Sequence, residues 1–294
     1  MDFVSLLRTN LLVTGDGAMG SQLIARGLPA DTPGVLWNIQ NPAAVRSAHR
    51  EYVEAGAQYL LANTFGANPV ALQRHGLEEQ LEEIIGAAVD NARDVAGEDM
   101  ALVGDLGPTG KLLEPIGDLS EEEAREAFRR QSTALAKAGV DAIMAETFDS
   151  SAELRLALEA AAASDVPLIA SMQFNAQENG QYRSVMGDGP EELMTVAEET
   201  GCVAMGTNCG QGIATMVGLV GQIAGLTDRP VIAQPNAGKP RLEGDTTVYD
   251  EPAHVFAEHV PELYEAGARI IGGCCGTGGD HVRVIRSFAD SLVE

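Results

Sequence analysis

The sequence is poor in lysine and in basic residues generally. Among 294 residues, 43 are Asp or Glu and only 19 are Lys or Arg, which gives a formal net charge of −24. Lysine occurs only as Lys111, Lys137 and Lys239. A surface this acidic repels phosphate backbones, so we expect no nucleic-acid partner. The acidity suits a saline cytoplasm or an ordinary solvated exterior, and a basic protein partner stays open.

Long apolar runs are also missing. No uninterrupted apolar stretch reaches the roughly 18 residues that a membrane span needs, so we expect no membrane contact. The first residues lack the basic start and apolar core of a secretory signal, which predicts a cytoplasmic protein. None of the four cysteines forms a CxxC pair, so a zinc ribbon or a thioredoxin-like motif has little support. Without export, free thiols or metal ligands are favoured over structural disulfides.

The composition is that of a packed α/β protein. Hydrophobic residues make up 45% of the chain, glycine counts 33, and aromatic residues are only 4%. This length suits two small domains or one (β/α)8 barrel, since such barrels run near ~250 residues. No linker rich in Pro, Ser or charge divides the chain, so we expect a single domain over residues 1–294.

Short apolar runs recur eight times, with amphipathic helical patterns between them. Such runs are typical of parallel strands covered on both faces. The predicted strands are 11–14, 59–62, 101–104, 142–145, 167–172, 204–207, 230–233 and 268–272. Clear helical patterns cover 77–95, 121–137, 151–163 and 190–199, and Ser120 with Glu123 reads as a capping box. This alternation predicts a single (β/α)8 TIM barrel.

A weak internal repeat supports the same architecture. The chain carries EAGAQYLLANTF at 54–65, KAGVDAIMAETF at 137–148 and EAGARIIGGCCG at 265–276. In each copy a predicted helix ends at Ala-Gly and an apolar strand follows, as an αβ unit requires.

Polar residues follow every predicted strand. In a parallel barrel these positions meet at the carboxyl-terminal mouth, where active sites of this fold lie. One polar residue at a strand end has an ordinary structural explanation, but polar residues at all eight favour a site. They include Asp16, Asn63, Thr64, Asp105, Glu146, Thr147, Gln173, Asn175, Asn208, Cys209, Gln234, Asn236, Cys274 and Cys275.

Three of these residues are cysteines. Cys209 follows the sixth strand, and Cys274 and Cys275 follow the eighth. Adjacent strand residues point to opposite faces, so both sulfurs reach one ion only if the glycine-rich backbone leaves regular geometry. Three thiolates with one open position are typical of a reactive zinc centre. A glycine-rich phosphate loop, a vicinal disulfide and unliganded thiols stay open, and Cys202 reads as a buried core residue.

Several motifs together resemble the homocysteine S-methyltransferase family. They are GDGAMGSQL at 15–23, NTFGAN at 63–68, TNCG at 207–210, PNAG at 235–238 and GGCCGT at 272–277. The resemblance runs essentially from end to end, and GGCCGT with an upstream NCG is the most specific part. It implies a (β/α)8 barrel whose Zn²⁺ ligands are Cys209, Cys274 and Cys275, with homocysteine as the thiol that is methylated.

The resemblance also implies contacts to the amino acid. Asp16 and Glu146 match the family's carboxylates, and an ammonium group needs such an acidic partner. We expect the backbone around Gly17, Ala18 and Met19 to complete the cradle, together with Thr147 and Asn63. Asp16 between two glycines is alternatively a simple turn former.

The sequence says less about the methyl donor. GPTGK at 107–111 and PNAGKP at 235–240 look closer to the homocysteine module of cobalamin-dependent methionine synthase than to betaine-dependent relatives. We therefore expect a methyl-corrinoid protein on a separate chain, with S-methylmethionine or S-adenosylmethionine next. Betaine is third, because Trp37 is the only tryptophan for an aromatic cage, although Phe65 and Tyr249 are available.

Two readings from other classes remain. A thiol- or zinc-binding barrel without catalysis would keep the cysteines, but Asp16 and Glu146 argue against it. An aldolase-like enzyme would use the glycines after the eighth strand for phosphate. It would also need a Schiff-base lysine at a strand end, and none of the three lysines lies in a predicted strand.

Overall fold

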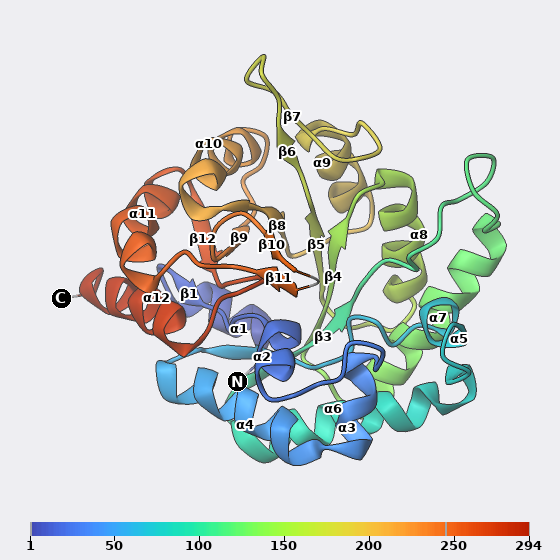
Figure 1. Cartoon of the computed structure of the whole chain (residues 1–294). Helices are drawn as coiled ribbons and strands as arrows, with labels where there is room; N and C mark the ends of the chain where they lie inside the picture. The colour runs from blue at the N-terminus through green and yellow to red at the C-terminus, as the bar shows by residue number, and fades with distance from the viewer. Residues whose placement is uncertain (1, 245, 294) are drawn as a thin grey trace.

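A computed structural model describes residues 2–244 and 246–293, and it has the predicted barrel architecture (Figure 1). Eight strands form one sheet in the order β1-β12-β9-β8-β5-β4-β3-β2, and every neighbouring pair in this order is parallel. The strands are β1 (Val13–Thr14), β2 (Tyr59–Leu61), β3 (Ala101–Leu106), β4 (Ala142–Phe148), β5 (Leu168–Met172), β8 (Ala204–Gly212), β9 (Val231–Asn236) and β12 (Ala268–Ile271). All eight predicted strands are confirmed, and β3, β4, β8 and β9 extend beyond their predicted ends.

A helix follows each barrel strand and packs outside the sheet. These helices are α4 (Pro42–Ala55), α6 (Leu81–Ala96), α7 (Glu121–Ala138), α8 (Ser151–Ala162), α9 (Pro190–Glu199), α10 (Ile213–Ala224), α11 (Ala253–Glu265) and α12 (Gly279–Ser291). The capping box predicted at Ser120 is present. The repeat is also explained, because Gly56 and Gly139 end α4 and α7 with φ of 96° and 87°.

The ring of strands has one seam, between β1 and β2. These two strands share no ladder, but Gln58 spans them: its N–H donates to the Thr14 carbonyl and its Oε1 accepts from the Thr14 N–H, each at 2.8 Å. Nearer the mouth, the Leu61 N–H donates to Asp16 Oδ2 at 2.8 Å. One backbone bond and two side-chain bonds therefore close the barrel where the ladder stops.

Smaller elements cover the two ends of the barrel. Helix α1 (Phe3–Thr9) places Phe3 and Leu6 in the apolar cluster that fills the barrel interior. The others belong to loops after strands: α2 (Met19–Ala25), η1 (Gly34–Leu36), α3 (Trp37–Gln40), α5 (Pro69–Gln73), η2 (Glu78–Gln80) and the hairpins β6 (Asn175–Ala176)–β7 (Tyr182–Arg183) and β10 (Arg241–Glu243)–β11 (Thr246–Val248). In Figure 1, β6–β7 projects from the molecule and β10–β11 lies near its centre.

The barrel interior changes from apolar to polar along the strands. Its apolar cluster includes Val103, Met144 and Ile232. Because side chains of a strand alternate between faces, the residue two positions later points the same way. Those positions hold Asp105, Glu146 and Gln234, which are all buried. The sequence therefore places a layer of buried polar groups directly above an apolar core.

A buried histidine lies on the outer helix layer. His49 of α4 is 0% exposed, and neither ring nitrogen has a hydrogen-bond partner. Burial lowers the pKa of His49 to about 4, because an unpaired imidazolium is costly away from water.

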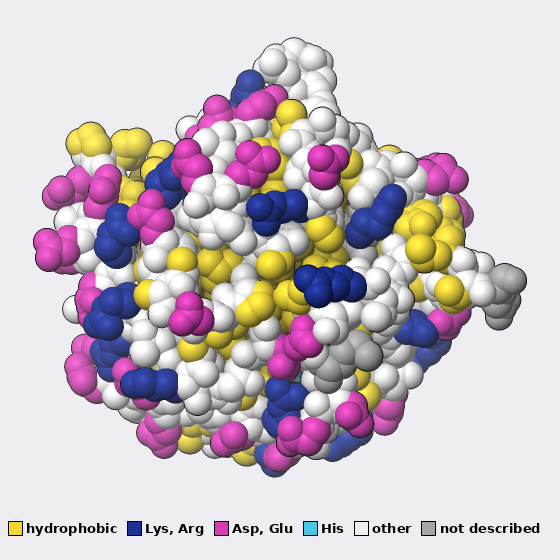
Figure 2. Space-filling model, turned by 180° about the vertical axis from the view of Figure 1, so that it is seen from behind, with side chains coloured by type: hydrophobic (Ala, Val, Ile, Leu, Met, Phe, Trp, Pro, Cys, Tyr) yellow, Lys and Arg dark blue, Asp and Glu magenta, His cyan; other side chains and the backbone are white. Residues whose placement is uncertain are grey.

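Figure 2 shows the molecule from behind, where apolar side chains gather near the middle of the face and charged side chains of both signs surround them. Across the described residues, no helix is both long and apolar enough to cross a membrane.

Candidate metal and substrate site

The three cysteines singled out by the sequence come together at the barrel mouth. The Sγ atoms of Cys209, Cys274 and Cys275 all lie within 4.8 Å of one another. All three thiols are free and partly buried. The fourth, Cys202, lies two residues before β8 and is fully buried in the apolar core, as predicted.

The backbone leaves strand geometry at both cysteine segments. Cys209 has a φ of 59°, a left-handed conformation that side-chain-bearing residues rarely adopt. After β12, Gly276 has a φ of 83°, and a Cβ there would lie 2.2 Å from the Cβ of Tyr249. These departures allow the adjacent Cys274 and Cys275 to present both sulfurs to one point, as the sequence required.

Hydrogen bonds fix the segment that carries the two adjacent cysteines. The Cys274 N–H donates to the Pro235 carbonyl at 2.8 Å, and the Cys275 carbonyl accepts from the Ala237 N–H at 2.9 Å. The Thr277 hydroxyl donates to the Cys274 carbonyl at 2.7 Å. The segment with Cys274 and Cys275 is therefore hydrogen-bonded to the end of β9.

Asn208 links Cys274 to the end of β4. Its Nδ2 donates to Thr147 Oγ1 at 2.6 Å and lies 3.9 Å from Cys274 Sγ. Its Oδ1 accepts from the Thr147 N–H and from the Ser171 hydroxyl. Thr147 itself is left-handed, with a φ of 62°. The predicted site residue Thr147 therefore holds Asn208 beside the thiol cluster.

The cluster favours a thiolate even before a metal is considered. Hydrogen bonds from the thiols of Cys209 and Cys274, with a smaller contribution from the Tyr249 hydroxyl, outweigh burial and lower the pKa of Cys275 to about 3. Donation to the neighbouring sulfurs raises the pKa of Cys274. Sulfur ligands bind metals as thiolates, so this environment is suited to a cation.

The geometry fits a tetrahedral thiolate-bound ion. Three sulfurs at about 2.3 Å from zinc lie roughly 3.8 Å apart, close to the separations of the thiol cluster, which do not exceed 4.8 Å. Three soft thiolates select zinc-like ions over Mg²⁺ or Ca²⁺, which prefer oxygen. The residues present can therefore hold such an ion and leave one position open.

Three buried carboxyl groups lie close enough to interact in the barrel mouth, and of these Glu146 is the one near the thiols, because the charge of Cys209 acts on it. Asp16, Asp105 and Glu146 are 1%, 7% and 8% exposed, and each has one oxygen without a hydrogen-bond partner. Burial, with the charge of Cys209 second, raises the pKa of Glu146 to about 8. Burial also raises the pKa of Asp16 and of Asp105. Within residues 2–244 and 246–293, no ion pair involves any of the three, so a cation is the ligand that they lack.

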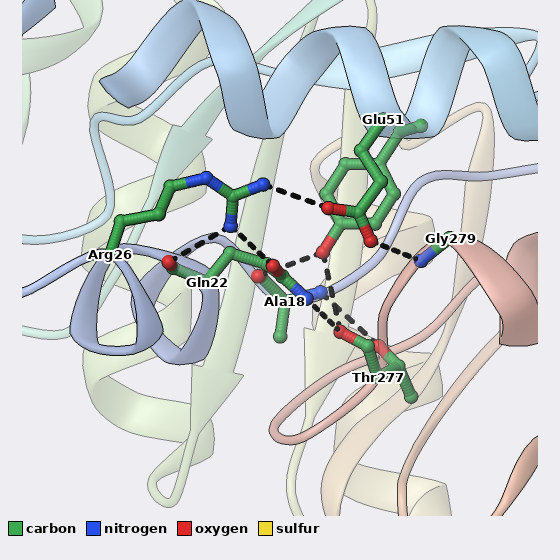
Figure 3. Close-up of polar contacts among 7 residues, drawn as sticks. Ala18, Gln22, Arg26, Glu51, Thr277 and Gly279 are labelled. Carbon is green, nitrogen blue, oxygen red and sulfur yellow. Dashed lines mark hydrogen bonds and ion pairs between the residues drawn. The ribbon is translucent and has the colours of Figure 1, made fainter.

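The predicted backbone cradle at residues 17–19 is held by a polar network (Figure 3). The Ala18 N–H donates to Thr277 Oγ1 at 3.2 Å, and its carbonyl accepts from the Tyr52 hydroxyl at 2.9 Å. Gly17 has no room for a side chain, because a Cβ would lie 2.9 Å from both Thr277 Oγ1 and Tyr52 Cε1. Met19 begins α2 immediately afterwards. The Ala18 amide is therefore already occupied by Thr277, and a contact of residues 17–19 with a substrate stays a prediction.

Arg26 and Glu51 extend this network to the outer helices. Arg26 pairs with Glu51 at 2.8 Å, and Glu51 accepts from the Gly279 N–H at 2.8 Å. Figure 3 shows these groups joining α2, α4 and the start of α12. The segment after β1 and the segment after β12, which carries Cys274 and Cys275, are therefore both bonded to α4 through Glu51.

Asn63 lies at the mouth but is largely occupied. Its Nδ2 donates to the Gly34 carbonyl and to Asn38 Oδ1, and its carbonyl accepts from Asn38. Of its side chain, the Oδ1 oxygen is left for a ligand.

Several residues have roles at the site that the sequence analysis did not assign to them. Asn208, Thr277 and Tyr249 position the thiols, and the unpartnered oxygens of Gln234 and Asn236 face the same buried region at the end of β9. The sequence marked Asn208, Gln234 and Asn236 as polar residues at strand ends and Thr277 as the last residue of GGCCGT, but it assigned none of them a contact and gave Tyr249 no role at Cys275.

Comparison with known proteins gives a consistent picture. The family model described as Homocysteine S-methyltransferase matches residues 13–289. The chain is 28% identical to methionine synthase of Mycobacterium tuberculosis and 28% identical to methionine synthase of Mycobacterium leprae, over 99% and 97% of its own length. It spans only 26% and 25% of those relatives.

A solved structure resembles the whole chain. It is the metallated form of the homocysteine methyltransferase MmuM from Escherichia coli, with a TM-score of 0.79 and 25% sequence identity. The match covers 97% of this chain and 98% of that one.

Proposed function

The chain belongs to the homocysteine S-methyltransferase family, and we propose that it uses zinc to activate homocysteine and transfers a methyl group to its sulfur, giving methionine. The observation that carries the proposal is the thiol cluster of Cys209, Cys274 and Cys275 at the same barrel mouth as buried carboxyl groups with unpartnered oxygens, of which Glu146 is near the thiols. Homocysteine has one group for each part of this site: a thiol for the metal and an ammonium for the acids.

The three cysteines would hold zinc and leave the fourth position for the substrate sulfur. A free thiol has a pKa near ~8.5, and a bound zinc ion would supply the positive charge that keeps the homocysteine sulfur deprotonated at neutral pH. Three protein thiolates offset that charge, so the substrate sulfur stays nucleophilic. Asn208 and Tyr249 would tune the cysteine sulfurs through hydrogen bonds.

The carboxyl groups would orient the amino acid. Asp16 and Glu146 carry unpartnered oxygens deep in the mouth and would accept from the substrate ammonium. The segment at residues 17–19 would lie against the other end of the amino acid, as in the predicted cradle. With both ends fixed, the sulfur forms a bond to the methyl carbon while the bond from that carbon to the donor breaks, and the donor keeps the electron pair.

For the methyl donor we infer a methyl-corrinoid protein on a separate chain. Support comes from exposed apolar side chains that lie in loops between a strand's carboxyl end and the next barrel helix, where a docking protein would contact them. Among the described residues these are Ile24, Phe65, Leu112, Ile116, Val185, Met186 and Leu242. S-methylmethionine or S-adenosylmethionine is the alternative. Betaine has less support, because Trp37 is buried against Leu23 and Val45 rather than free to form a cage.

The test is a zinc-edge X-ray absorption spectrum of the reduced protein with and without homocysteine. We expect one zinc per chain, with three sulfur ligands that become four when homocysteine is added. Zinc without a spectral response would refute homocysteine as the thiol, and protein that cannot be loaded with zinc would refute the metal site. Methionine formation with methylcobalamin, S-methylmethionine, S-adenosylmethionine or betaine then separates the donors.

A further inference from the structure

Three acids, not two, have an unpartnered oxygen in the barrel mouth. They are Asp16 Oδ1, Asp105 Oδ1 and Glu146 Oε2. Asp105 lies at the end of β3 and is 7% exposed. Its backbone is committed, because its N–H donates to Thr64 Oγ1 at 3.0 Å and its carbonyl accepts from Thr64 Oγ1 and Gln131 Nε2. Its carboxyl group is the part left without a structural task.

The strand register directs Asp105 toward Glu146. Asp105 pairs with Met144 on the neighbouring β4, and Glu146 follows Met144 by two residues. Met144 and Val103 both belong to the apolar cluster inside the barrel. Because a strand alternates its faces, Asp105 and Glu146 therefore point into the same interior, one layer above that cluster.

Asp16 approaches the same region from the other side of β2. Its Oδ2 accepts from the Leu61 N–H of β2 at 2.8 Å, which leaves only Oδ1 for a ligand. The negative charges of Glu146 and Asp16 both raise the pKa of Asp105, after the larger effect of burial. The charge of Glu146 likewise raises the pKa of Asp16. The three groups thus lie close enough to act on one another.

We propose that Asp105 is a third substrate-binding carboxylate. Together, Asp16, Asp105 and Glu146 accept one hydrogen bond each from the three N–H groups of one primary ammonium. This inference rests on the proposed function, because the thiol substrate supplies the ammonium. A primary ammonium carries three donors, and the site offers one unpartnered buried oxygen from each acid. An uncharged ligand would leave the acids unpaired, so the site selects thiols that carry a primary ammonium.

The test compares homocysteine with its des-amino analogue, mercaptobutanoate, which keeps the thiol and the carboxylate. Binding of each to the zinc-loaded enzyme is measured by calorimetry for the wild type and for Asp105→Asn. Loss of one charge-assisted hydrogen bond should weaken homocysteine binding about 10- to 100-fold. Mercaptobutanoate binding, zinc content and the sulfur count at the metal should not change.

Glu153→Gln provides a matched control. Glu153 is also 7% exposed, but its carboxylate accepts from the N–H and hydroxyl of Thr109 and holds a loop. It should leave the preference for homocysteine over mercaptobutanoate unchanged. Equal losses of both thiols in Asp105→Asn would mean a structural role and would overturn the inference, as would no loss of either.

A measurement on the wild type alone guards against a misfolded variant. N-methylhomocysteine keeps the positive charge but has only two N–H donors, so it should bind about 10- to 100-fold more weakly than homocysteine. Equal binding would overturn the three-carboxylate arrangement. If wild-type enzyme binds homocysteine at zinc and only these comparisons fail, the proposed function stands without the inference. If homocysteine does not bind at all, both fail.

Discussion

Replacing Glu146 by glutamine should stabilise the ligand-free protein while weakening its hold on homocysteine. Burial, and then the charge of Cys209, raise the pKa of Glu146 from 4.5 to about 8. Between these values the folded protein keeps a proton that the unfolded chain releases, so stability is lost as pH rises from 4.5 to 8. Glutamine has the same shape and does not ionise, so the variant escapes this loss.

The size of the effect follows from the pKa. At pH 7 the solution lies about 2.5 pH units above the ordinary carboxyl value, and each unit corresponds to roughly 1.4 kcal/mol. Glu146→Gln should therefore raise the free energy of unfolding by about 3 kcal/mol at pH 7. For a chain of this size that corresponds to a melting temperature higher by roughly 5–10 °C.

Thermal unfolding of metal-free, reduced wild type and variant, at several pH values between 5.5 and 8.5, measures this difference. The gap should widen steadily toward pH 8, and once zinc is loaded, added homocysteine should stabilise the wild type more than the variant. Glu126→Gln on the exposed surface of α7 serves as the control and should shift nothing comparable. A gap that does not change with pH, or a less stable variant at pH 7, would refute the account of Glu146 as an unpaired buried acid.

Three further outcomes are expected. Cys274→Ala should lose zinc, measured by elemental analysis, and Cys202→Ala should keep it; zinc loss in both would show that the ligand assignment is wrong. The lowered pKa of His49 means that the unfolded chain takes up its proton first, so the free energy of unfolding should fall by about 3 kcal/mol between pH 6.5 and 4. Urea titrations should show a flatter profile for His49→Leu and an unaltered one for the exposed His75→Leu. Gly276→Ala should lower the melting temperature and zinc content together, since a Cβ there meets Tyr249 and φ is 83°; a normal zinc content would contradict the proposed role of that turn.

The strands and the thiol ligands were predictable because their signals are local. Eight apolar runs gave eight barrel strands, and the Ala-Gly repeat marked helix ends where Gly56 and Gly139 adopt left-handed conformations. Glycines around Cys274 predicted the departure from strand geometry that the structure has. The hairpins β6–β7 and β10–β11 escaped prediction because their strands are only two or three residues long and lie outside the core.

The support of the site could not be predicted, because it depends on contacts between distant segments. Thr277 reaches Ala18 and Tyr52 across more than two hundred residues. Asp105 was recognised only as one polar residue among fourteen at strand ends. Its importance appears when the β3–β4 register sets it on the same face as Glu146.

The seam between β1 and β2 has a dynamic consequence. Seven neighbouring strand pairs are held by backbone ladders. Between β1 and β2, side-chain bonds of Gln58 and Asp16 replace such a ladder, so we expect these two strands to separate first in local opening of the barrel. Asp16 has two tasks there: one oxygen fastens Leu61, and the other faces the proposed ammonium pocket. Occupancy of that pocket should fix the carboxylate and so slow hydrogen exchange at the Leu61 amide. Closure of the barrel and capture of the amino acid would then be thermodynamically linked through one side chain.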